Sequence, residues 1–243
     1  MTYIKTITYG DNIEIYQYDH KPPPHIVGKK RKEKIEPDEE RKFEKRKDNA
    51  IQAQRNFRRL VGANLSSSPL LISLTYKENM ENITTAYKDH KSFIQALRYE
   101  FGKDIKYIAV PEFQKRGAVH FHSLFWGLPR EVFLKEKETR HIAEMWGHGF
   151  IDVIETDGHG KISSYLAKYM AKAFTDRRLR NQKAYATSRN VTRPVVEKDG
   201  LILPLLYAHV EENALPIIDS RYNTKWLGNC HYRHFAKTKN LGL

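Results

Sequence analysis

Two histidines and one glutamate stand at a spacing that suits a metal site. Residues 111–122 (PEFQKRGAVHFH) read as the end of one β-strand, a tight basic turn and the start of the next strand. Side chains alternate along a strand, so His120 and His122 share one face. A turn through residues 114–117 would bring Glu112 beside them. Two imidazoles and a carboxylate are three ligands for a divalent ion and leave positions open for substrate, as in a catalytic metal site.

The same three residues also have an ordinary interpretation. A His-x-His pair on a strand is more often a half-exposed or hydrogen-bonded pair than a ligand set. Glu112 would then be a charge at the edge of a turn. The catalytic interpretation therefore depends on the residues that follow downstream.

A second reactive group lies on the helix predicted from Lys161 (KISSYLAKYMAKAF). One apolar stripe suits packing on a sheet, and beside it, at helical spacing, run Tyr165, Lys168, Tyr169 and Lys172. A tyrosine hydroxyl near a divalent ion can attack a phosphodiester, while the ion neutralises phosphate charge. The lysines would lower the tyrosine pKa or bind the developing anion. Each residue alone reads as a boundary tyrosine or a solubility lysine, but the four together favour catalysis.

Composition points to a polyanionic partner. The chain has 243 residues with 42 Lys and Arg against 29 Asp and Glu, a net charge of +13. Cys230 is the only cysteine, which excludes an intramolecular disulfide and a cysteine zinc site. No apolar run is long enough to span a bilayer, and the first residues lack the apolar region of a signal peptide. We therefore expect a cytoplasmic protein with a nucleic-acid partner and no membrane association.

Hydrophobic periodicity predicts an α+β fold. A hairpin of residues 3–9 and 12–18 precedes a polar helix that starts after Pro37 and ends near Gly62. The following elements are expected at 70–76 (strand), 83–101 (helix), 105–113 and 118–126 (strands), 130–146 (helix), 149–154 (strand) and from 161 (helix). This order predicts an antiparallel sheet with a split βαβ arrangement, helices on one face and the other face open. Residues 201–210 suggest an edge strand, and residues 226–235 receive no assignment.

The combined motif resembles the HUH endonucleases. Glu112, His120 and His122 followed by Tyr165-x-x-Lys168-Tyr169 are most similar to the rolling-circle replication initiators of small plasmids and single-stranded DNA phages, in their two-tyrosine form. The similarity spans roughly residues 69–175 and implies a ferredoxin-like or RRM-like nuclease core.

The resemblance implies a role for each site residue. His120, His122 and Glu112 would bind Mg²⁺ or Mn²⁺, and Tyr165, assisted by Lys168, would nick DNA and keep the 5′ end as a phosphotyrosine ester. Tyr169 would be a second nucleophile. The rival third ligands are Asp152, His141 and His148.

The expected partner is single-stranded or cruciform origin DNA in a bacterial host. Residues 161–193 carry nine Lys and Arg against one Asp, beside the tyrosine helix. Expected DNA contacts are Thr75, Tyr76, Arg116, Lys172, Arg177 and Arg178. The sequence has no G-x-x-x-x-G-K-[ST] loop, so a host helicase is expected to separate the strands and a host polymerase to extend them.

The expected organisation has three parts. Residues 1–64 would form a β-hairpin and basic helical arm, residues 65–176 the endonuclease domain, and residues 177–243 a basic extension that could complete the sheet. Two alternatives remain open: a relaxase or transposase with the same chemistry, and a non-catalytic RRM-like nucleic-acid-binding module.

Overall fold

The computed structural model describes residues 2–23, 39–65, 68–134, 136–156, 166, 172–173, 176–179, 182–198 and 215–236. Of these, residues 39–48, 134, 136–139 and 177 are described by their backbone alone. The chain divides into two compact units, one of residues 1–46 with 193–243 and the other of residues 47–192. These units differ from the sequence-based division at residues 64 and 176, because segments from both ends of the chain pair with each other.

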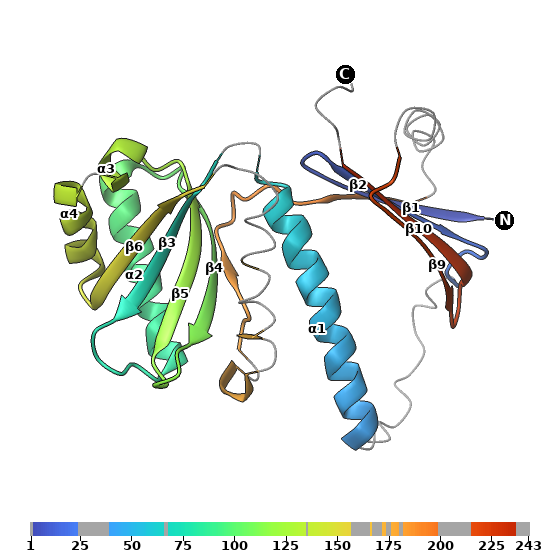
Figure 1. Ribbon diagram of the computed structural model, residues 1–243, viewed down its shortest axis with the longest axis horizontal. Helices are drawn as coiled ribbons and strands as arrows, with labels where there is room; N and C mark the ends of the chain where they lie inside the picture. Colours follow the sequence, from blue (N-terminus) through green and yellow to red (C-terminus); the bar gives the residue numbers. More distant parts are fainter. Residues whose placement is uncertain are drawn as a thin grey trace. The chain divides into compact units, whose positions relative to one another are not determined.

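The unit of residues 47–192 is built on a five-stranded sheet (Figure 1). Its strands are β3 (Leu70–Tyr76), β4 (Lys106–Phe113), β5 (Val119–Trp126), β6 (Gly149–Glu155) and β7 (Ala186–Thr187). They lie in the order β6-β3-β5-β4-β7, and every pairing is antiparallel. The expected antiparallel α+β core is confirmed.

Helix α2 (Ile83–Phe101) covers one face of this sheet (Figure 1). The Asn82 side chain caps its start by accepting hydrogen bonds from the backbone N–H groups of Thr84 and Thr85. Its end is at Gly102, whose positive φ of 104° suits glycine. Both ends lie where the sequence predicted them.

Three further helices belong wholly or partly to this unit. They are α1 (Glu39–Gly62), α3 (Arg130–Leu134) and α4 (Glu136–Trp146). The predicted helix over 130–146 is thus two helices on either side of residue 135. Residues 166, 172 and 173 are helical, but the rest of the predicted tyrosine helix and the predicted strand at 201–210 lie outside the described residues. No helix among the described residues is long and apolar enough to cross a membrane.

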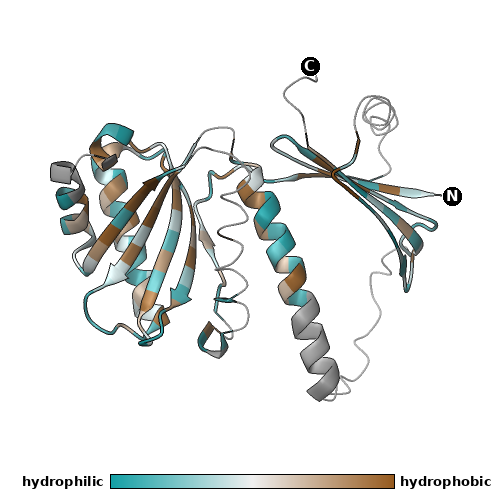
Figure 2. Ribbon diagram, in the orientation of Figure 1, coloured by the Kyte–Doolittle hydropathy of each residue, from teal (hydrophilic) through white to brown (hydrophobic). Residues whose placement is uncertain are grey.

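Large aromatic side chains fill the space between α2 and the sheet. Phe93 on α2 meets Phe125 and Trp146 edge to face, with ring centroids 6.4 and 5.8 Å apart. Phe121 is fully buried and lies 4.7 Å from the ring of His90 on α2. Figure 2 shows hydrophobic residues along the strands of this sheet. Since Phe121 faces α2, its neighbours on β5, His120 and His122, face away from that helix, as the alternation predicted.

His90 makes this core sensitive to acid. Burial lowers the pKa of His90 to about 4, and its Nε2 lies 3.3 Å from the Ser123 hydroxyl. Below pH 6.5 the unfolded chain takes up a proton that the folded chain refuses, so stability is complete above pH 6.5 and falls until about pH 4. We expect His90→Gln to lose about 3 kcal/mol less than the wild type between pH 7 and pH 4. Urea unfolding of both proteins at the two pH values measures this difference, and equal losses would contradict it.

The second unit contains another five-stranded antiparallel sheet, in the order β8-β1-β2-β10-β9. Its strands are β1 (Tyr3–Tyr9), β2 (Asn12–Tyr18), β8 (Val195–Lys198), β9 (Ile218–Thr224) and β10 (Gly228–Ala236). The N-terminal hairpin is confirmed. The aromatic and basic tail without a sequence assignment forms the β9–β10 hairpin, and β10 pairs with β2.

Candidate active site

Two rows of side chains cross the sheet on the face turned away from α2. In antiparallel strands, residues directly opposite each other share a face. The first row is Glu112, His120, Thr75 and Phe150, on β4, β5, β3 and β6. The second row is Val110, His122, Ser73 and Asp152, on the same four strands. Glu112 and the two histidines, far from adjacent in sequence, are thereby brought together.

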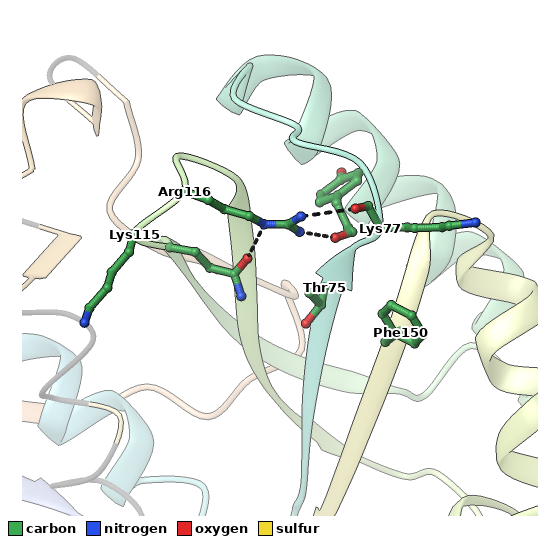
Figure 3. A pocket seen from close by; sticks show the side chains of 7 residues that line it. Thr75, Lys77, Lys115, Arg116 and Phe150 are labelled. Atoms are coloured by element: carbon green, nitrogen blue, oxygen red, sulfur yellow. Dashed lines mark hydrogen bonds between the residues drawn. The ribbon is translucent and has the colours of Figure 1, made fainter.

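The β4–β5 turn sets this register. Gly117 has φ +99°, a conformation that other residues rarely adopt, and its N–H donates to the Gln114 carbonyl at 2.9 Å. The Arg116 guanidinium donates to the Gln114 side chain at 3.2 Å and to the backbone carbonyls of Tyr76 and Lys77 (Figure 3). Arg116 therefore ties the turn to the end of β3, beside the first row.

Glu112 joins the histidine pair to a lysine. Its Oε2 lies 2.9 Å from Nε2 of His122, and its Oε1 accepts a hydrogen bond from Nζ of Lys172 at 2.5 Å. The rings of His120 and His122 have centroids 4.6 Å apart. Lys172 thus links the second reactive group of the sequence to the first. We interpret the contact as a cation held beside the carboxylate that the sequence assigned to metal binding.

Hydroxyl groups on β3 orient both imidazoles. Nδ1 of His120 lies 2.8 Å from the Thr75 hydroxyl, and Nδ1 of His122 lies 3.3 Å from the Ser73 hydroxyl. A hydrogen bond at Nδ1 fixes the ring and, where Nδ1 carries the proton, leaves the Nε2 lone pair for a metal ion. This is the arrangement commonly found around histidine ligands.

Burial and charge set the protonation of the three residues. Burial, followed by the neighbouring His122, lowers the pKa of His120 to about 4. Burial also lowers the pKa of His122, against the opposing effect of Glu112. Burial alone would raise the pKa of Glu112, but hydrogen bonds from Lys172 and His122 outweigh it and hold that pKa below its usual value. At neutral pH the site therefore offers two neutral imidazoles and one carboxylate, the forms that bind metal ions.

The donor set suits a divalent ion, although the three side chains are not yet gathered around one point. Among the described residues, no three His, Cys, Asp or Glu side chains form a ready metal-binding group. Neighbouring ligands of an octahedral ion with bonds of about 2.1 Å lie about 3 Å apart. The 2.9 Å between His122 Nε2 and Glu112 Oε2 matches that spacing. A small movement of His120 and the release of Lys172 would complete the set.

The rival ligands have other surroundings. His141 lies 2.8 Å from Glu100, and His148 lies 3.8 Å from Asp89. Asp152 is exposed on β6, opposite Ser73 and one strand further from His122 than Ser73 is. Glu112 is thus the carboxylate in contact with the histidine pair.

The other expected site residues are placed in several ways. Tyr165, Lys168 and Tyr169 lie outside the described residues, and Arg177 is described by its backbone alone. The Tyr76 ring is buried, and its hydroxyl donates to Asp89 at 2.8 Å.

Arg178 is exposed, pairs with Asp176, and lies over the Phe113 ring with its guanidinium carbon 3.9 Å from the centroid. Sequence reasoning missed Ser73, Gln114 and Phe150. The two-residue alternation along β3 and β6 was the available signal for Ser73 and Phe150.

Comparison with known proteins associates this part of the chain with replication. Residues 69–174 match the family model of the replication-associated protein ORF2. The matched stretch is less than half of the chain and contains β3 to β6 with all three proposed metal ligands. Neither the curated proteins nor the solved structures include a match.

Proposed function

We propose that the protein initiates rolling-circle replication by nicking and rejoining single-stranded DNA at a specific origin. The observation that carries the proposal is the meeting of Glu112, His120 and His122 on the open face of the sheet, within the segment that matches the replication-associated family. The net charge of +13 supports a DNA substrate.

Glu112, His120 and His122 would hold Mg²⁺ or Mn²⁺. When bound, the ion would neutralise charge on the scissile phosphate and polarise it for attack. The chain's own residues prepare for this: the imidazoles are kept neutral by burial, and Ser73 and Thr75 orient them. Lys172, which neutralises Glu112 in the metal-free protein, would be released to bind a DNA phosphate.

Tyr165 is the proposed nucleophile. Its hydroxyl oxygen forms a bond to phosphorus while the bond from phosphorus to the 3′ oxygen breaks, and the hydroxyl proton ends on that leaving oxygen. The 5′ phosphate stays on the protein as a tyrosine ester. Because the ester keeps the energy of the phosphodiester, rejoining needs no ATP. Tyr169 would attack in the second transfer, and Lys168 would stabilise the phenolate.

A randomised single-stranded oligonucleotide library tests the proposal without knowledge of the origin. With Mg²⁺ or Mn²⁺ we expect a covalent adduct that survives denaturing electrophoresis, carries a 3′-end label and is absent in EDTA. Sequencing the attached strands would give the nick site. An absence of adduct with every divalent ion, together with tight DNA binding, would indicate the non-catalytic module instead. A relaxase or transposase would give the same adduct and would differ in the nick site recovered.

A further inference from the structure

A pocket of about 400 Å³ lies beside the first row of the candidate active site. This volume is within the range of small-molecule sites. Its walls come from the end of β3, the β4–β5 turn and β6 (Figure 3). The lining residues are Thr75, Tyr76, Lys77, Gln114, Lys115, Arg116 and Phe150.

Phe150 gives the pocket an exposed aromatic surface. It lies on the open face of the sheet, directly opposite Thr75 on β3, and 68% of its surface is accessible. Ile154, four residues further along β6, lies on the same face and is 46% exposed. An isolated exposed hydrophobic residue is ordinary, but a ring at the edge of a basic pocket is the feature that single-strand-binding proteins use to stack bases.

The charged lining of this pocket is entirely basic. Lys77 and Lys115 are exposed, and no Asp or Glu is among the lining residues. The guanidinium of Arg116 already donates to two backbone carbonyls and to Gln114. Arg116 therefore shapes the wall, and the two lysines remain as the cations that can meet phosphate.

Two residues connect the pocket to the histidine pair. The Thr75 hydroxyl is 2.8 Å from Nδ1 of His120. The side chain of Gln114 accepts a hydrogen bond from Arg116 and has its Nε2 3.4 Å from the same Nδ1. A molecule in the pocket therefore lies next to the proposed metal ligands, separated from His120 by one side chain.

We propose that this pocket binds one nucleotide of the single-stranded DNA, next to the phosphate that is cut. The base stacks on Phe150, while Lys77 and Lys115 bind the flanking phosphates. The nucleotide's position relative to the nick rests on the proposed function, but binding itself does not. Phe150 is thus a DNA-binding residue that holds the strand in register with the site.

Binding in EDTA, without cleavage, tests this proposal. With a fluorescein-labelled oligonucleotide of mixed sequence, Phe150→Ala and Phe150→Leu should each weaken binding about 5- to 100-fold, because both lack the ring. Phe150→Trp should bind like the wild type, and DNA should change the emission of the new indole relative to the wild-type signal. Tyr99→Ala is the matched control: Tyr99 is 95% exposed on α2, which covers the opposite face, and its loss should have no effect.

The two lysines have a separate signature. Lys77→Gln and Lys115→Gln should each reduce the slope of log affinity against log salt concentration by about 0.7, the value for one single-strand phosphate contact. Wild-type affinity in Phe150→Ala and Phe150→Leu with no emission change in Phe150→Trp would overturn the proposal. Tighter binding of an RNA of the same sequence would overturn DNA as the occupant. Absence of cleavage by the wild type, with Phe150-dependent binding retained, would overturn the nicking function and leave the pocket assignment standing.

Discussion

His120→Ala and His122→Ala should each reduce metal-dependent DNA cleavage by on the order of 10²- to 10³-fold, the cost of removing one group that stabilises transition-state charge. Each variant removes one of the two imidazoles that burial keeps neutral and ready to bind a metal ion. In His122→Ala, Glu112 also loses its 2.9 Å contact and is left with Lys172. Calorimetric titration with Mn²⁺ should show weakened binding in both variants, in parallel with the loss of cleavage.

Two controls separate ligand loss from other effects. His141→Ala removes an exposed histidine that contacts Glu100, and it should leave Mn²⁺ affinity unchanged. Ser73→Ala keeps both imidazoles but removes the hydroxyl near Nδ1 of His122, so it should weaken Mn²⁺ binding only about 10- to 100-fold. Urea unfolding in EDTA shows whether each variant is folded. Normal Mn²⁺ affinity in folded His120→Ala and His122→Ala would disprove the ligand assignment.

The local part of this fold is readable from the sequence. Strand alternation was enough to put His120 and His122 on one face, and the polar turn with Gly117 was enough to bring Glu112 opposite His120. The ends of α2 follow from the Asn82 and Gly102 caps. These features depend on residues near each other in the chain, and the physics that specifies them acts over the same short range.

The unpredicted features all depend on distant segments. The pairing of β10 with β2 joins residues more than 200 positions apart, and nothing in either strand names its partner. Phe150 was readable as a strand residue, but its place beside Thr75 required the order of the strands. The contact of Lys172 with Glu112 likewise joins a helix to a strand 60 positions away. The sequence thus predicted the chemistry of the site better than the surface around it.

Tyr165→Phe should eliminate the covalent protein–DNA adduct while DNA affinity in EDTA stays within about twofold of the wild type, because only the nucleophilic oxygen is removed. The assay is the adduct on a denaturing gel, with a 3′-labelled strand recovered from the randomised library. Tyr169→Phe is the matched variant, four residues away on the same predicted helix stripe. If Tyr169 acts only in the second transfer, this variant should still form the first adduct and should fail to pass the strand to a second tyrosine.

The pair of variants assigns the two hydroxyls independently of the metal site. An undiminished adduct in Tyr165→Phe that disappears in Tyr169→Phe would move the first attack to Tyr169, and the metal and pocket assignments would be unaffected. An adduct that survives in both single variants and is lost only in the double variant would mean that either hydroxyl reaches the phosphate. Residues four apart on a helix lie about 6 Å apart on one face, so that outcome would require the scissile phosphate to lie between them.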